Sequence, residues 1–134
     1  MKRGLLALSL IAIIFNAEAH WTKLPFTDST VDQYIDPTRI DNKRKPYPAL
    51  WVLVDFRNEV KKNAFGKLYK SHIILYDIDC ISRKLKIGVV YYYQNGMGEG
   101  QVVDTLETNM DKFITPPPYS PGEFYIKLVC SFDK

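Results

Sequence analysis

The chain has 134 residues, of which 46% are hydrophobic and 25% charged, with a formal net charge of +3. This length fits one domain with a modest core, and the near-balance of charge argues against nucleic acid or an acidic membrane surface as the main partner. Two cysteines and two histidines further restrict the redox and metal chemistry available to the chain.

Residues 1–19 predict a secretory signal peptide. Lys2 and Arg3 form a positive start, residues 5–15 are an apolar core too short to anchor comfortably in a bilayer, and residues 17–19 match an A-x-A cleavage site. No cysteine lies near that site, so no lipid attachment is predicted, and no later apolar run is long enough for a transmembrane helix. We therefore expect one exported domain over residues 20–134, located in the periplasm, at the cell surface or outside the cell.

Runs rich in Val, Ile and Tyr predict six β-strands. In chain order these strands span residues 21–24, 31–35, 50–56, 71–80, 85–93 and 101–103. The third strand is almost continuously apolar, which predicts that both of its faces are covered. Residues 58–69 are polar and basic and predict a mobile connection between the third and fourth strands.

The fourth and fifth strands form the centre of the predicted sheet. The short break at residues 81–84 makes them an antiparallel hairpin. Strict alternation places one set of side chains of each arm on a common face: Ile74, Tyr76, Ile78 and Cys80 in the first arm, and Leu85, Ile87, Val89 and Tyr91 in the second.

A helix is predicted near the C-terminus, after the stiff segment of residues 115–119. Ser120 suits the N-cap, Pro121 the first helical position, and Glu123 completes a capping box. Helical spacing then places three residues on the face that would meet the sheet, namely Ile126, Val129 and Cys130. Because an exported compartment permits disulfides, one bridge between Cys80 and Cys130 is the simplest arrangement, with two free thiols or an intermolecular bond as alternatives.

Several segments together resemble the surface-adhesin protein E-like family of exported bacterial domains. The segments that carry the resemblance lie in family order: Trp21, residues 34–37, 50–55 and 79–80, the Tyr91–Tyr93 run, residues 96–98 and 101–103, and the tail from Pro116 to Cys130. They are spread over nearly all of residues 20–134.

This resemblance implies an α+β fold. Its core would be a six-stranded antiparallel sheet with a C-terminal helix packed on its concave face and tethered there by a Cys80–Cys130 disulfide. It also implies a protein partner, such as a host extracellular-matrix or plasma protein, and an association of two copies through the sheet region. The alternative function is a periplasmic envelope-maintenance or assembly factor without a host ligand.

Three consecutive tyrosines indicate where such a partner would bind. Residues 91–93 cannot all face the core, so at least Tyr92 should point away from its two neighbours. Tyrosine is enriched at protein interfaces. The expected contact residues are Tyr92, Tyr93, Asn95 and Met97. The alternative is that Tyr92 lies beneath a loop, or that the patch joins two copies of the chain.

Catalytic and metal sites are not expected. Ser71 and His72 are neighbours on a strand and therefore point to opposite faces, which does not suit a nucleophile and its base. Asp77 and Asp79 share one face and could do acid–base work, but exposure to solvent or pairing with nearby Lys and Arg is the simpler explanation. An N-terminal His20 with His72 could chelate copper, but two histidines carry little weight, and we predict no enzyme, no metal and no cofactor.

Overall fold

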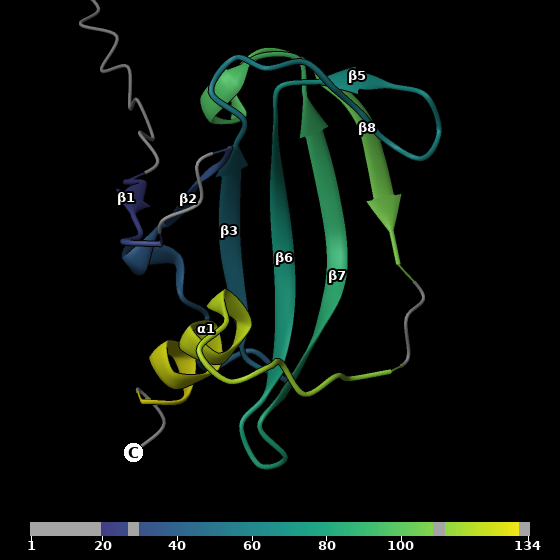
Figure 1. Cartoon of the computed structure of the whole chain (residues 1–134). Helices are drawn as coiled ribbons and strands as arrows, with labels where there is room; N and C mark the ends of the chain where they lie inside the picture. Colours follow the sequence, from purple (N-terminus) through teal and green to yellow (C-terminus); the bar gives the residue numbers. More distant parts are fainter. Residues whose placement is uncertain (1–19, 27–29, 109–111, 132–134) are drawn as a thin grey trace, which may run out of the picture.

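The computed structural model describes residues 20–26, 30–108 and 112–131, so the predicted signal peptide lies outside the described residues. Six strands form one antiparallel sheet in the order β1-β2-β3-β6-β7-β8, and β4 pairs with β5 separately (Figure 1). The elements are β1 (Thr22–Lys23), β2 (Asp32–Ile35), the 3₁₀ turn η1 (Pro37–Arg39), β3 (Ala49–Asp55), β4 (Lys61–Lys62), β5 (Leu68–Tyr69), β6 (Ser71–Asp79), β7 (Lys84–Tyr93), the 3₁₀ turn η2 (Gly96–Gly98), β8 (Val102–Glu107) and α1 (Pro121–Cys130). The predicted fold class is confirmed.

The helix α1 covers one end of the sheet, next to the β6–β7 turn (Figure 1). Ser120 is the N-cap, as the sequence indicates, and its Oγ accepts a hydrogen bond from the Glu123 N–H at 3.4 Å. The predicted capping box is only half formed, because Glu123 Oε2 accepts from the Tyr119 N–H at 2.7 Å, whereas the Ser120 N–H donates to the Pro117 carbonyl. Ile126 and Val129 are 2% and 0% exposed and pack against the sheet. The predicted helix and its buried face are therefore confirmed.

A disulfide joins the end of β6 to the end of α1. Cys80 and Cys130 have Cα atoms 5.6 Å apart and are bonded through sulfur. This confirms the tether and leaves no free cysteine among the described residues. The helix is ten residues long, which is marginal for an isolated helix, so packing and the disulfide hold it in place.

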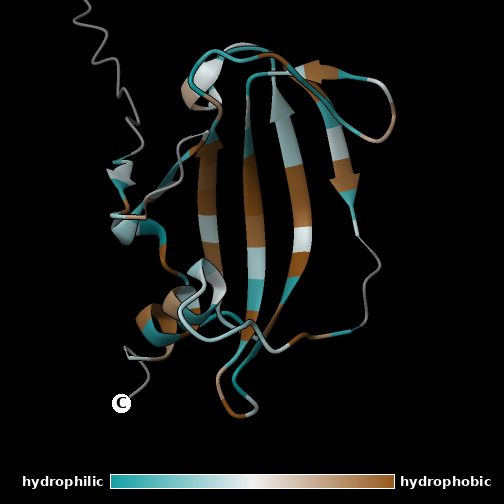
Figure 2. Ribbon diagram, viewed as in Figure 1, coloured by the Kyte–Doolittle hydropathy of each residue, from teal (hydrophilic) through white to brown (hydrophobic). Residues whose placement is uncertain are grey.

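The sheet has two faces, which we call the helix face and the outer face. Residues opposite one another in antiparallel pairs share a face, so Leu50, Val52, Tyr76 and Ile78 lie on the helix face with α1. The outer face is carried by the intervening residues of β3, β6 and β7. Figure 2 shows that hydrophobic residues follow one another along much of these strands, as expected where both faces carry apolar side chains.

A bulge in the central hairpin changes which residues share a face. Leu75 pairs with Val89 whereas Tyr76 pairs with Ile87, so Gly88 is the extra residue. Leu85 and Ile87 consequently lie on the helix face, while Val89 and Tyr91 lie on the outer face. Strict alternation had placed all four together, and that prediction is wrong because one inserted residue exchanges the two faces.

The segment between β3 and β6 also differs from the prediction. Within residues 58–69, predicted as a mobile connection, the structure contains the β4–β5 hairpin, in which Lys61 pairs with Tyr69. Asn63 Oδ1 accepts hydrogen bonds from the N–H groups of Phe65 and Lys67, and its Nδ2 donates to Asp104 Oδ2 at 2.7 Å. The hairpin thereby folds over the ends of β7 and β8 (Figure 1).

No helix in the described part of the chain combines the length and apolar character that crossing a membrane requires.

Candidate functional site

The outer face carries a strip of aromatic side chains across three strands. The pairing of Trp51 with Leu75 and of Ile73 with both Leu53 and Tyr91 brings these residues onto one surface. Tyr93 joins them from the end of β7, opposite Ser71. We call Trp51, Ile73, Tyr91 and Tyr93 the aromatic strip.

The aromatic strip is half-buried rather than covered. The rings of Trp51 and Tyr91 stack with centroids 6.1 Å apart. Trp21 and Arg39 border the strip at the edge of the sheet and complete a hollow of about 170 Å³. Partial burial raises the pKa of Tyr93, and the neighbouring Tyr91 adds to this effect, so the Tyr93 hydroxyl stays a neutral donor and acceptor at physiological pH.

The η2 turn borders the strip at the other end. Gly98 has a φ of +66°, and a Cβ at this position would lie 2.9 Å from Ile73 Cδ1. Glycine therefore allows the backbone of the turn to rest on the outer face, where Leu53 is 0% exposed. The third strand is thus covered on its outer face at Leu53 and on its helix face at Leu50 and Val52. Because Trp51 is left half-exposed on the outer face, the prediction that both faces are covered holds only in part.

Buried Ser71 holds the turn in place. Its hydroxyl donates to the Asn95 carbonyl at 2.6 Å and accepts from the Gly98 N–H at 2.9 Å. The Met97 N–H donates to Asp55 Oδ1 at 3.4 Å. These bonds fix Asn95 and Met97 beside Tyr93.

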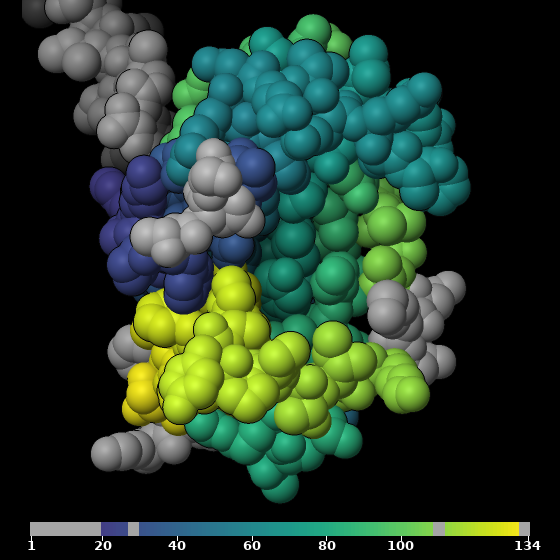
Figure 3. All heavy atoms as spheres, in the orientation of Figure 1, coloured from purple at the N-terminus to yellow at the C-terminus, as the bar shows by residue number. Residues whose placement is uncertain are grey.

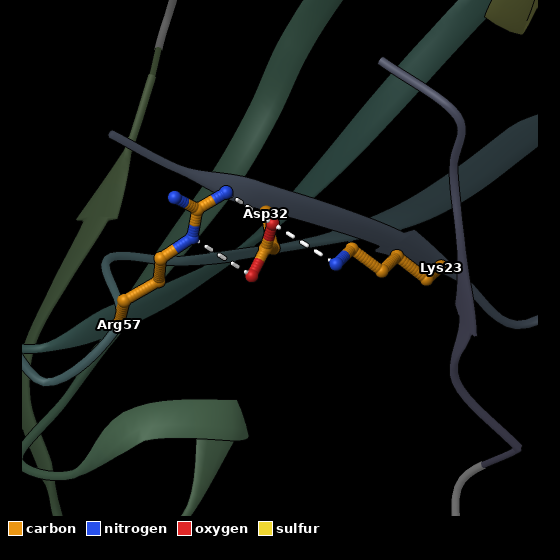
Figure 4. Close-up of polar contacts among 3 residues, drawn as sticks. All are labelled: Lys23, Asp32 and Arg57. Carbon is orange, nitrogen blue, oxygen red and sulfur yellow. Dashed lines mark hydrogen bonds and ion pairs between the residues drawn. The ribbon is translucent and has the colours of Figure 1, made fainter. Parts of the chain in front are cut away.

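Charged residues lie on the same side of the sheet. Asp32 pairs with Asp55 across β2 and β3, so its carboxylate belongs to the outer face. It accepts from Arg57 at 2.8 and 3.1 Å and is 3.3 Å from Lys23 Nζ (Figure 4). The hydrogen bond from Arg57, with that from Lys23, lowers the pKa of Asp32 to about 2. Two cations, one from β1 and one from the loop after β3, therefore hold one carboxylate at the start of β2 on the outer face.

The four expected contact residues do not lie together. Tyr93, Asn95 and Met97 lie on the outer face or in the turn beside it, whereas Tyr92 points to the helix face, opposite its neighbours as expected. There its ring lies 4.7 Å from that of Tyr69 in β5. The structure thus places Tyr92 under the β4–β5 hairpin, the alternative location for this residue.

Tyr92 belongs to an aromatic cluster that surrounds His72. The His72 ring lies 5.4 Å from Phe56, 5.7 Å from Tyr69 and 5.7 Å from Tyr92. Its Nδ1 is buried and has no hydrogen-bond partner among the described residues. Burial lowers the pKa of His72 to about 4, so the imidazole is neutral at physiological pH.

The residues weighed for catalysis have structural partners. The Ser71 hydroxyl serves the η2 turn, on the face opposite to His72. Asp77 forms an ion pair with Arg44. Asp79 Oδ1 accepts from the N–H groups of Ile81 and Ser82, and the hydrogen bonds from Ser82 lower its pKa. These contacts tie the two carboxylates to neighbouring loops.

The two histidines have different surroundings. The His20 N–H donates to Asp36 Oδ2 at 3.3 Å, near the start of η1, whereas His72 lies in the aromatic cluster. Across residues 20–26, 30–108 and 112–131, no group of three or more His, Cys, Asp or Glu side chains is placed to hold a metal ion.

Sequence reasoning missed Trp51, Tyr91 and Ile73 as members of an exposed surface. One signal was present for Tyr91: a glycine inside a strand, Gly88, often marks a bulge that exchanges the faces. Trp51 had no such signal, because a tryptophan within an apolar run is also typical of a core.

Comparison with known proteins gives one match. The family model described as surface-adhesin protein E matches residues 21–131. No curated protein and no solved structure matches the chain.

Proposed function

The chain belongs to the surface-adhesin protein E family, and on that premise we propose that it is an exported, adhesin-like domain that contacts a host matrix or plasma protein through the aromatic strip of its outer face. The role proposed is binding rather than catalysis. The observation that carries the proposal is the half-buried stack of Trp51 and Tyr91 on the sheet face opposite α1.

The composition of the strip supports a protein partner. Trp, Tyr and Arg are the residues that most often dominate the binding energy of protein interfaces. Trp51, Tyr91 and Tyr93 supply rigid amphipathic area, and Arg39 lies at the border. Rigid strands hold these side chains, so little conformational entropy is lost when a partner covers them.

The η2 turn extends this surface. Asn95 is exposed and Met97 is half-buried beside the strip. A methionine adapts to irregular partner surfaces, and the Ser71 and Asp55 hydrogen bonds keep the turn in place. Tyr93, Asn95 and Met97 therefore remain proposed contact residues, joined by Trp51 and Tyr91. Tyr92 is replaced in this role because Tyr69 covers it.

Two tyrosines on opposite faces of one strand provide the test. Binding to a panel of purified matrix and plasma proteins would be measured by surface plasmon resonance for wild type, Tyr93→Ala and Tyr92→Ala. We expect Tyr93→Ala to weaken binding about ten-fold or more, the effect of a contact residue at an interface centre. Tyr92→Ala should bind as the wild type does once its fold is verified by circular dichroism. The reverse pattern would overturn the proposed face.

Location is tested separately. Added protease should cleave the protein on intact cells, with a periplasmic protein as the protected control. Protection until the outer membrane is opened would exclude direct host contact and leave the envelope-maintenance alternative. Size-exclusion chromatography of the Tyr91→Ala variant shows whether a second copy of the chain uses the same face.

A further inference from the structure

The segment of residues 59–70, which contains the β4–β5 hairpin, carries large hydrophobic side chains in solvent. Val60, Phe65 and Leu68 are 53%, 69% and 60% exposed. The hairpin reaches past the edge strand β8 in Figure 1 and forms a teal projection at the upper right of Figure 3. Exposed apolar residues gathered on one projecting element indicate a surface that contacts another body.

The two sides of the hairpin have different surroundings. Lys61 pairs with Tyr69, and Lys62 pairs with Leu68, so the members of each pair share one side. Tyr69 is 9% exposed and its ring stacks on that of His72 with centroids 5.7 Å apart, so its side faces the sheet. The side that carries Lys62 and Leu68 therefore faces solvent.

The tip of the hairpin presents Phe65 from a hydrogen-bonded turn. The Gly66 N–H donates to the Asn63 carbonyl at 3.0 Å, and Asn63 Oδ1 accepts from the Phe65 N–H at 3.0 Å. Gly66 has a φ of +80°, and a Cβ at this position would lie 3.6 Å from Lys62 Cε, so the stem of this lysine lies against the turn. An exposed aromatic ring and a lysine thus occupy the same tip.

The same segment carries a local excess of positive charge. Residues 59–70 contain four lysines and one glutamate, a net charge of +3, which equals that of the whole chain. Glu59 pairs with Lys61 at 3.0 Å. Within the part of the chain that the structure describes, no ion pair engages the other three lysines, which are Lys62, Lys67 and Lys70.

The carboxylate that contacts the hairpin from the sheet has other donors. Asp104 accepts from Asn63 Nδ2 at 2.7 Å and from the Thr105 N–H at 2.9 Å. It lies opposite Tyr92, on the face that the hairpin covers. Lys62 and Lys67 therefore keep their charge for an external partner, and the near-balance of charge over the whole chain hides this local excess.

An exposed apolar tip with lysines beside it complements a membrane surface. Aromatic and aliphatic side chains gain by entering the boundary between headgroups and acyl chains, while lysine buries its stem and keeps its ammonium at the phosphates. Each lysine near an anionic surface strengthens attachment about five-fold. A bilayer also deforms around a projecting tip, whereas a folded protein would need a matching hollow.

We propose that the β4–β5 hairpin docks the domain on an anionic phospholipid membrane, with Phe65 and Leu68 at the acyl boundary and Lys62 and Lys67 at the headgroup phosphates. The contact is peripheral and reversible, because few side chains enter the bilayer. None of these residues belongs to the aromatic strip, which lies on the outer face, so the proposed protein-binding role does not depend on this contact.

Sedimentation with lipid vesicles measures the contact. Residues 20–134 would be used, so that the apolar residues 5–15 cannot contribute. One set of vesicles contains phosphatidylglycerol and phosphatidylcholine in equal parts, and the other contains phosphatidylcholine alone. We expect about ten-fold or tighter binding to the anionic vesicles, because two lysines meet charged headgroups, and raised salt should remove most of this difference.

A matched pair of variants tests the apolar part of the contact. Phe65→Ala should weaken binding to the anionic vesicles about ten-fold, the effect of losing one large side chain that enters the bilayer. Ile81→Ala is the control, because Ile81 is 98% exposed in the β6–β7 turn at the other end of the sheet (Figure 1). This control should bind as the wild type does.

A second matched pair tests the charges. Lys62→Gln with Lys67→Gln should weaken binding to the anionic vesicles about ten-fold or more and leave the weak binding to phosphatidylcholine unchanged. The control is Lys43→Gln with Lys45→Gln, which removes the same charge from exposed positions in the loop before β3.

Three results would each overturn the proposal. The first is a folded wild type that does not sediment with the anionic vesicles. The second is equal binding by a hairpin variant and its control, which would indicate a general hydrophobic or charge effect. The third is a lysine pair that lowers binding to matrix or plasma proteins while vesicles are not bound, which would assign the hairpin to the protein-binding surface.

Discussion

Leu50 and Trp51 are neighbours on β3, yet they have opposite surroundings. Leu50 is 0% exposed on the helix face, whereas Trp51 stacks on Tyr91 and stays half-exposed on the outer face. The helix face is closed by α1 and a disulfide, and the outer face is bordered by a short turn and ion pairs. One set of strands thus supplies both the core and an aromatic surface, and the two faces should respond differently to substitution.

The largest expected effect is on the covered side. Changing Cys80 and Cys130 to serine together removes a bridge that spans 50 residues of sequence. In the chain-entropy model this costs about 4 kcal/mol in free energy of unfolding. Urea unfolding followed by circular dichroism measures the loss. A loss below about 1 kcal/mol would mean that packing alone fixes α1.

The second effect concerns the aromatic cluster and its pH dependence. The pKa of His72 falls from its usual 6.5 to about 4 in the folded protein, because burial disfavours the charged imidazole. The unfolded chain therefore takes up the proton first, and stability contributed by neutral His72 is present above pH 6.5 and lost as the pH falls toward 4. The expected loss at pH 4 is about 3 kcal/mol.

The matched variant is His72→Phe, which keeps an aromatic ring and removes the buried Nδ1. Its free energy of unfolding should change much less between pH 7 and pH 4 than that of the wild type. Asp32, with a pKa of about 2, titrates below this window and does not obscure the comparison. Equal pH profiles for the two proteins would show that His72 is not responsible.

The third effect sharpens the comparison on the outer face. Gly98→Ala places a methyl group at a φ of +66° and 2.9 Å from Ile73 Cδ1. We expect a loss of about 1–3 kcal/mol from backbone strain and steric conflict. Gly66→Ala is the control, because Gly66 has a φ of +80° but its nearest neighbour, Lys62 Cε, would be 3.6 Å away. If the two variants lose the same stability, the contact with Ile73 is unimportant.

The smallest effect on stability is expected in the aromatic strip itself. Tyr93→Thr replaces one residue of high strand propensity with another and should cost no more than about 1 kcal/mol. Leu50→Ala on the helix face should cost about 2–5 kcal/mol by leaving a cavity. Thermal and urea unfolding of both variants test the difference. A larger loss from Tyr93→Thr would mean that the outer face is also core.

The parts that could be predicted from the sequence are those that local rules govern. The Ser120 N-cap and Pro121 start a helix wherever that helix packs, and the short break after Asp79 makes a hairpin. The tether followed from two cysteines and the family resemblance. The helix start and the hairpin depend on neighbouring residues alone, so predicting them needs no knowledge of distant contacts.

What could not be predicted depends on partners far along the chain. The β4–β5 hairpin is polar and short, and Asn63 anchors it to Asp104, which is 41 residues away. Tyr92 is half-buried only because that hairpin covers it. The bulge at Gly88 exchanged the faces of Val89 and Tyr91, which determines the composition of the aromatic strip. A pattern of alternation cannot locate an inserted residue without the opposite strand.

The order of strands has a mechanical consequence. Residues 80 and 130 are covalently joined, so β7, β8 and α1 lie within one closed loop, whereas β1 and β2 lie outside it at the edge of the sheet. A force that pulls on the chain before β1 first separates the two residue pairs between β1 and β2, and then the four residue pairs between β2 and β3. These strands would detach one after the other while the loop stays closed. Under tension the domain would lengthen stepwise at its N-terminal edge and keep β6, β7 and most of the aromatic strip in register.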